Sequence, residues 1–196
     1  MRTRDTNKEE IVKQKAIEMI VSQGIEGFGM NRLAKECGIS VATLYIYYSD
    51  KEDLIRKIGI DIGQKFFLKM LDGFSADMSF KDGLRKQWEN RIHFTLNFTQ
   101  QAVCFEILKQ STYGDAIIQE ITGDFKKTMS QFMLTAIEKK EVVSVSFEVF
   151  WSIAYGSLYS LLELHREGKS MSGKPFEFTE KIKDEAFQLV LKALTP

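Results

Sequence analysis

The 196-residue sequence contains only two prolines, two cysteines and two histidines. The prolines, Pro175 and Pro196, leave most of the chain without a residue that would interrupt a helix. Cys37 and Cys104 stand far apart, outside any Cys-x-x-Cys motif and without a flanking histidine cluster. Their isolation argues against a zinc site and against a disulfide-built secreted domain. We therefore expect a protein of a reducing compartment, with no metal and no cofactor.

The sequence also lacks a net charge and a long apolar segment. Lys plus Arg and Asp plus Glu both number 27, so attraction to nucleic acid must come from the local placement of charge. The opening MRTRDTNKEE has no apolar core of a signal peptide, and no later segment runs for about 18 apolar residues without a charge. These absences predict a cytoplasmic protein without a membrane span.

Sequence signals of catalysis are missing as well. His93 and His165 are far apart, and neither a Gly-x-Ser-x-Gly motif nor a glycine-rich phosphate loop occurs. We therefore predict no catalytic residues and do not expect an enzyme.

Apolar residues recur at intervals of three and four along most of the chain, which is the period of an α-helix. Residues 8–23 show this pattern, with Asn7 as a possible N-cap and Gly24 as a C-terminal stop. Residues 114–140 are predicted as a single helix. The pattern as a whole predicts an all-α protein with about nine helices.

The segment MNRLAKECGISVATLYIYYSDKEDLI, residues 30–55, predicts two short helices joined by a tight Gly-Ile-Ser turn. Ser40 is the expected N-cap of the second helix, and Ser49 or Asp50 that of the helix that follows. A short helix, a turn that begins with glycine and a second short helix are typical of a helix-turn-helix. In that motif the second helix enters the major groove, while the first crosses the DNA backbone.

This segment resembles the N-terminal signature of the TetR family of transcriptional regulators, an "IA…AGVS…LY…F…KE.L" skeleton. The positions that fit are Leu33, Ala34, Gly38, Ile39, Ser40, Thr43, Leu44, Tyr45, Tyr48, Lys51, Glu52 and Leu54. The resemblance covers about the first 60 residues at motif level. The rest of the chain agrees with the family in length, in helicity and in its two long C-terminal helices.

The resemblance implies two domains. Residues 1–50 are expected to form a three-helix DNA-binding head, with the helix-turn-helix at about 29–48. Residues 51–196 are expected to form a helical ligand-binding and dimerisation domain. The implied function is that of a ligand-responsive regulator, a homodimeric repressor that binds a palindromic double-stranded DNA operator. The alternative is a helical protein–protein interaction module that retains the helix-turn-helix head.

The resemblance also implies which residues face DNA. These are Asn31 before the turn, Lys51 on a phosphate, and Ser40, Val41, Ala42, Thr43, Tyr45 and Tyr47 on the recognition helix. Leu44 and Tyr48 are four residues apart and are expected in the core, whereas Tyr45 and Tyr47 lie on other faces. All three tyrosines could instead belong to the core of an ordinary bundle.

Three positions depart from the family pattern. Met30 stands where a threonine commonly touches a phosphate, Ile46 replaces an aromatic or polar residue, and Tyr47 stands where histidine is frequent. The N-terminal arm is locally basic and could lie along the DNA backbone, or could be a solvated tail. Its basic residues are Arg2, Arg4, Lys8, Lys13 and Lys15.

The two long C-terminal helices are the expected dimer interface. Ser152, Gly156 and Ser160 form a stripe of small residues that would let a second helix approach closely. By resemblance, these helices make a four-helix bundle between subunits, although the stripe could instead pack inside one subunit. The remaining interface residues are Leu164, Ala186, Leu189 and Ala193.

The middle of the chain is rich in aromatic residues, and in the family this region encloses a pocket for a small hydrophobic effector. Most of these side chains are expected in the core. The predicted lining consists of Phe67, Trp88, His93, Phe94, Phe105, Trp151 and Tyr155. Polar residues on the same predicted helix as His93 could orient a ligand, and they include Gln87, Glu89, Arg91 and Thr95.

Overall fold

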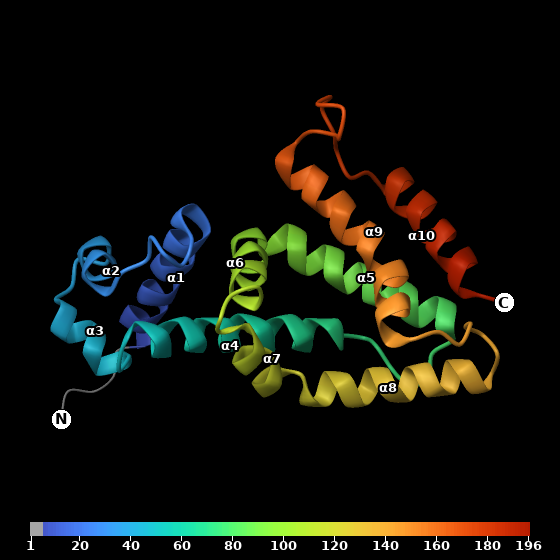
Figure 1. The fold of residues 1–196 in the computed structure, drawn as a ribbon, viewed down its shortest axis with the longest axis horizontal. Helices are drawn as coiled ribbons and strands as arrows, with labels where there is room; N and C mark the ends of the chain where they lie inside the picture. The colour runs from blue at the N-terminus through green and yellow to red at the C-terminus, as the bar shows by residue number, and fades with distance from the viewer. Residues whose placement is uncertain (1–5) are drawn as a thin grey trace. The chain divides into compact units, whose positions relative to one another are not determined.

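The computed structural model describes residues 6–196, which form ten α-helices without a named strand (Figure 1). The all-α prediction is confirmed, with one helix more than expected. The helices are α1 (Thr6–Gln23), α2 (Met30–Glu36), α3 (Val41–Tyr47), α4 (Lys51–Met70), α5 (Phe80–Asn97), α6 (Thr99–Lys109), α7 (Gly114–Ile121), α8 (Gly123–Glu138), α9 (Phe147–Glu167) and α10 (Glu180–Leu194).

The additional helix comes from residues 114–140, which form α7 and α8 rather than one helix. Thr122 separates them, and its hydroxyl donates a hydrogen bond to the carbonyl oxygen of Ile118 at 2.9 Å. A β-branched residue followed by Gly123 is a weak place in a helix, because both residues have low helix propensity. At the start of the chain α1 includes Asn7, so the predicted N-cap at this residue is wrong. Gly24 ends α1 with a left-handed φ of 70°, as predicted.

The described residues form two compact units. The first unit holds the described chain up to Leu68 together with Leu96–Gly123. The second unit holds Lys69–Thr95 and Asp124–Pro196.

In the first unit, α1, α2 and α3 group around the start of α4 (Figure 1). The side chains of Ile20, Leu33, Leu44 and Leu54 are completely buried between these helices. Further along α4, two glycines let α7 approach closely. A Cβ on Gly59 would collide with Ile117, and a Cβ on Gly63 would collide with Ile121.

The core of the second unit is aromatic. The ring of Phe132 stacks on Phe80, and a Cβ on Gly83 would collide with Phe132. Trp88 is buried, and its indole Nε1 donates a hydrogen bond to the carbonyl oxygen of Ala154 in α9 at 2.7 Å. In the same unit α9 and α10 lie side by side (Figure 1).

Both cysteines are free. Cys104 is buried, and burial raises the pKa of its thiol to about 12, so the thiol stays protonated. Across residues 6–196, no helix is long and apolar enough to cross a membrane.

Candidate functional site

The turn between α2 and α3 is held by backbone and side-chain hydrogen bonds. Gly38 takes a left-handed φ of 64°, which glycine adopts without the strain that a Cβ would add. The amide of Ile39 donates to the carbonyl oxygen of Ala34 at 3.0 Å, which closes the end of α2. Ser40 caps α3, because its Oγ accepts a hydrogen bond from the amide of Thr43 at 3.1 Å. The predicted N-cap at Ser40 is therefore confirmed.

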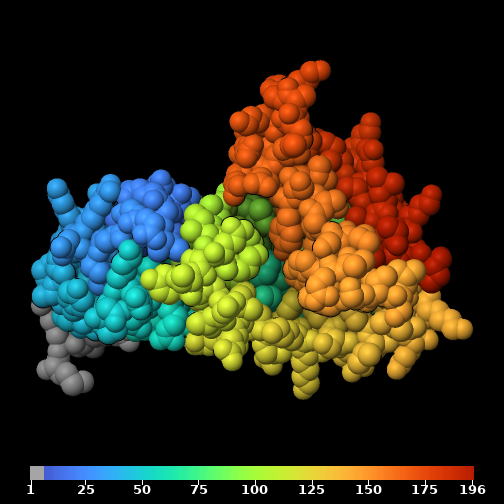
Figure 2. All heavy atoms as spheres, in the orientation of Figure 1, coloured from blue at the N-terminus to red at the C-terminus, as the bar shows by residue number. Residues whose placement is uncertain are grey.

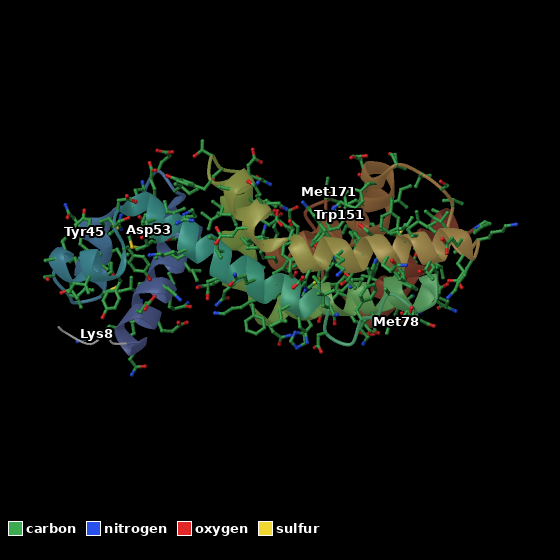
Figure 3. The ribbon with its side chains drawn as sticks, turned by 90° about the horizontal axis from the view of Figure 1, so that it is seen from below. Lys8, Tyr45, Asp53, Met78, Trp151 and Met171 are labelled. Atoms are coloured by element: carbon green, nitrogen blue, oxygen red, sulfur yellow. The ribbon has the colours of Figure 1, made fainter. Side chains whose placement is uncertain are left out.

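Apolar side chains fix the orientation of α3. Leu44 and Tyr48 are buried, which confirms their predicted place in the core. The opposite face of α3 carries Ala42, Tyr45 and Ile46, all of them exposed. Figure 3 labels Tyr45 at the end of the first unit where α2 and α3 lie. A helix held in this way presents one face outward while its other face is fixed in the core.

The structure brings most of the predicted DNA-facing residues to the surface. Asn31, Ser40, Ala42 and Tyr45 are exposed, and Val41, Thr43 and Lys51 are half-buried. Tyr47 differs, since it is 6% exposed against 53% for Tyr45. Burial leaves only a small part of Tyr47 for a contact with DNA.

Lys51 lies at the start of α4 and has partners within the first unit. Its Nζ donates a hydrogen bond to the carbonyl oxygen of Ile25 at 3.1 Å and lies 5.9 Å from the ring centroid of Phe28. An ammonium group has three N–H donors, so Lys51 could donate to a phosphate while it keeps its hydrogen bond to Ile25. The N-cap of α4 is Asp50, whose Oδ1 accepts from the amide of Asp53 at 2.7 Å.

Sequence reasoning did not single out two exposed cations on α2. They are Arg32, whose Nη1 donates to Gln23 Oε1 at 2.7 Å, and Lys35. Among the residues that the structure describes, neither has a carboxylate oxygen within 4.0 Å. Their exposure together with nearby Asn31 gives α2 a polar, basic surface. The signal available in the sequence was the basic character of the polar positions in MNRLAKE.

Two lysines of the predicted basic arm form ion pairs within the described chain. Lys13 pairs with Asp61 at 3.8 Å, and Lys15 pairs with Glu18 at 2.7 Å. The Lys15 ammonium, which donates a hydrogen bond to Glu18, holds the pKa of that carboxyl below its usual range. Arg2 and Arg4 lie outside the described residues.

The predicted dimer-interface residues lie on outward-facing positions of the second unit. Ser152, Gly156 and Ser160 are exposed on α9, so this stripe does not pack inside the subunit. No atom lies within 4 Å of where a Cβ on Gly156 would stand. Atoms of α9 form part of the surface in Figure 2. Leu164 and Ala186 are half-buried, whereas Ala193 and the 65%-exposed Leu189 are open to solvent.

The predicted pocket residues divide between the two units. Phe67 and Phe105 belong to the first unit, and the other five belong to the second. Within the second unit Trp88, Phe94 and Tyr155 are buried, Trp151 is half-buried and His93 is exposed. Trp151 and Tyr155 are in contact, with ring centroids 4.8 Å apart.

A hollow of about 850 Å³ lies elsewhere, in the first unit. Its lining includes Glu26, Asp50 and Glu52 but none of the predicted pocket residues. Burial, and then Glu52, Glu26 and Asp50, raise the pKa of Tyr113 in the same lining. Among the described residues, no group of three or more His, Cys, Asp or Glu side chains lies together in a way that could hold a metal ion.

Comparison with known proteins links the α1–α4 region to transcriptional regulators. Residues 13–58 match the model of the bacterial regulatory proteins of the tetR family. An HTH-type transcriptional regulator of Staphylococcus aureus is 37% identical over 115 residues, which cover 56% of this chain and 60% of that protein. An uncharacterized HTH-type transcriptional regulator of Haemophilus influenzae is 23% identical over 94 residues, 48% of this chain and 50% of that protein. The chain thus matches between half and three fifths of the length of these two relatives.

Two solved structures share the fold over nearly the whole chain. A TetR family transcription regulator from Marinobacter aquaeolei has a TM-score of 0.84 at 23% identity and covers 99% of this chain and 98% of its own. A TetR-family regulator from Haemophilus influenzae has a TM-score of 0.78 at 15% identity and covers both chains completely, at 100% each. At such low identity the likeness concerns the fold alone. The predicted resemblance to the TetR family is confirmed by these matches.

Proposed function

We propose that this chain, whose residues 13–58 match the model of the tetR family of bacterial regulatory proteins, is a DNA-binding transcriptional regulator. It acts in the cytoplasm as a homodimeric repressor on a palindromic operator, and a small effector releases it. Residues up to about 50 form the DNA-binding domain, and the residues after it bind the effector and the second subunit.

The observation that carries this proposal is the geometry of α2, its turn and α3. The left-handed Gly38 and the Ser40 cap fix α3 at a defined angle to α2. The buried Leu44 anchors one face of α3, which leaves Ala42 and Tyr45 on the other. A short, rigidly held helix with a free outer face is what insertion into a major groove requires.

We assign different roles to the exposed and half-buried residues of α2 and α3 according to their side-chain chemistry. The phenol of Tyr45 donates a hydrogen bond to a phosphate, and Ala42 offers an apolar contact to a thymine methyl group. Asn31, Val41 and Thr43 lie toward base edges, with Ser40 beside them. Arg32 and Lys35 on α2 contact phosphates, because the first helix of the motif crosses the DNA backbone.

The second unit supplies the proposed dimer interface. A single recognition helix reads too few base pairs for specificity, and a two-fold dimer places two such helices on half-sites about 34–36 Å apart. The exposed small residues of α9 and the exposed Leu189 on α10 give a surface that a second copy can cover.

Effector binding is proposed for the aromatic region that contains Trp151 and Tyr155. Coupling between two ligands is reciprocal, so an effector that weakens operator binding must itself bind more weakly when the operator is present.

The salt dependence of operator binding tests the role of α2. Replacing Lys35 with alanine is expected to weaken binding about equally for all sequences. It should also lower the slope of log affinity against log salt by about 0.9 for each lost phosphate contact, about 1.8 for a dimer. Lys51→Ala is expected to lower the slope as well. Fluorescence anisotropy with labelled operator at several salt concentrations measures both effects.

Lys65→Ala is the matched control. Lys65 is exposed and pairs with Asp61 at 2.9 Å, about 21 Å along α4 from its first residue. This variant should keep the slope of the unmodified protein. If the Lys35→Ala and Lys65→Ala proteins have the same slope, Lys35 of α2 does not contact DNA.

A further inference from the structure

Arg91 in α5 is a completely buried guanidinium inside the second unit, at 0% exposure. Its Nη1 donates hydrogen bonds to the backbone carbonyl oxygen of Gln87 at 3.0 Å and to Gln87 Oε1 at 2.5 Å. The guanidinium carbon lies 3.8 Å from the ring centroid of Tyr155 and 5.3 Å from that of Trp151. Neutral groups therefore surround a full positive charge.

No carboxylate of the described chain lies within 4.0 Å of Arg91. Glu89 on the same helix is exposed and pairs with Lys86 at 2.8 Å. The Tyr155 phenol does not supply the missing anion, because burial raises its pKa and keeps it neutral. A buried charge without a counter-ion is strongly unfavourable, so the guanidinium of Arg91 is a site where an anion would be stabilising.

The N–H groups of Arg91 that lack a hydrogen-bond partner lie on one edge of the guanidinium. Nε and Nη2 are both buried and have no hydrogen-bond partner in the described structure. Their N–H bonds lie side by side along one edge of the planar guanidinium, the arrangement that receives the two oxygens of a carboxylate. Gln87 cannot fill this edge, because its Oε1 already accepts from Nη1 and its Nε2 donates to the carbonyl oxygen of Met70 at 2.6 Å.

Arg85, another arginine of α5, has the carboxylate partner that Arg91 lacks. Arg85 lies over the ring of Phe187, with its guanidinium carbon 4.3 Å from the ring centroid. It is half-buried and has Asp184 as an ion-pair partner at 3.7 Å. Arg91 has aromatic neighbours as well, but it has neither the solvent nor the carboxylate.

Aromatic side chains connect Arg91 with the surface. Phe147, Trp151 and Tyr155 follow one another at four-residue intervals on α9, and successive centroids are 5.8 Å and 4.8 Å apart. Phe147 is 63% exposed, Trp151 is half-buried and Tyr155 is buried. Trp151, in the middle of this series, is labelled in Figure 3. The three rings therefore form a continuous apolar path from the solvent to the guanidinium.

We propose that Arg91 binds the carboxylate of an apolar or aromatic carboxylic acid, whose hydrocarbon part packs against Trp151 and Tyr155. A monoanion balances the single charge of Arg91, whereas a phosphate group carries about −1.5 to −2 and would leave a buried negative charge. The inference rests on the proposed function, in which this unit takes a small effector, and specifies the chemical class of that effector.

Matched pairs of small molecules test the site. The probes are straight-chain carboxylates from butyrate to dodecanoate and aryl carboxylates from benzoate to naphthoate, each paired with its neutral primary amide. Trp88 and Trp151, the only tryptophans, report binding by fluorescence. At least one carboxylate is expected to bind saturably and at least about tenfold more tightly than its amide, a difference that a charge-assisted bidentate contact readily supplies.

The Arg91→Met variant is expected to bind the carboxylate no more tightly than the amide. Its thermal midpoint should be at least as high as that of the unmodified protein, since an unpaired buried charge has been removed. Arg85→Met is the control and should keep the preference for the carboxylate. If no carboxylate in the panel binds, if the amides bind as tightly, or if Arg91→Met keeps the preference, the proposal is wrong.

Operator binding is measured separately with the unmodified protein. A carboxylate that binds through Arg91 without changing operator affinity would support this site and contradict the effector step of the proposed function. An operator released only by neutral compounds, with no carboxylate bound, would overturn the site while the regulator proposal stands.

Discussion

A Gly156→Arg protein is expected to be a folded monomer that no longer binds its operator tightly. Nothing lies within 4 Å of a Cβ at this position, so the subunit can accept the new side chain without strain. Loss of glycine from the interior of α9 should slightly raise helix stability. Any large effect must therefore come from contacts that Gly156 makes with a second copy.

In the proposed dimer, arginine at position 156 would hold the partner helix away and place a charge in an interface without a partner. An uncompensated buried charge costs about 3–5 kcal/mol, which corresponds to a dimer weaker by roughly a hundredfold to several thousandfold. Operator affinity should fall at least about a hundredfold, because one head alone reads a single half-site.

Sedimentation equilibrium, together with thermal unfolding, measures this effect. Gln131→Arg, which adds the same charge at an exposed position of α8, is the control and should remain dimeric. A well-folded dimer of the Gly156→Arg protein would show that the interface lies elsewhere.

Replacing Tyr45 with glutamate is expected to abolish operator binding while leaving the fold and the dimer intact. Tyr45 is half exposed, so the substitution removes little core packing and should change the free energy of unfolding by about 0.5 kcal/mol or less. At the DNA surface it replaces a hydrogen-bond donor with a carboxylate that phosphates repel. A hydrogen bond to a charged group contributes about 1.5–3 kcal/mol, and a dimer loses two of them, which gives a loss of about a hundredfold or more.

Anisotropy titrations with operator DNA, supported by circular dichroism, test this expectation. Leu68→Glu adds the same charge at a position of α4 that is 75% exposed, and it should bind almost normally. Tyr45→Phe separates the hydroxyl from the ring, and it should lose affinity without the added repulsion. Unchanged binding by the Tyr45→Glu protein would exclude α3 as the recognition helix.

Local sequence patterns predicted the three-helix DNA-binding head well, because its turn and its helix cap depend on residues that are close together in the sequence. Gly38 and Ser40 fix the turn by backbone conformation and capping, and Leu44 and Tyr48 enter the core through helical spacing. The burial of Tyr47 was harder to predict, since it depends on how α3 rotates against the rest of the head. The break between α7 and α8 at Thr122 was missed because apolar spacing continues across it.

The aromatic region was the least predictable part. Trp88, predicted to line a pocket, donates its hydrogen bond to Ala154, more than 60 positions along the chain. Periodicity places a side chain on a helix face but does not reveal which distant group will satisfy it. Arg91 illustrates the same limit, because the sequence shows one arginine among the many polar residues of α5, while its missing counter-ion becomes visible only after packing.

Footprinting of this protein on the DNA fragments that it selects is the most decisive experiment. We expect two protected half-sites related by a two-fold axis, with centres about one helical turn or a multiple apart. The Tyr45→Glu protein should protect neither half-site. A protein that selects no fragment at any salt concentration, or that gives the same footprint after Tyr45→Glu, would contradict the claim that this chain is a dimeric regulator reading DNA through α3.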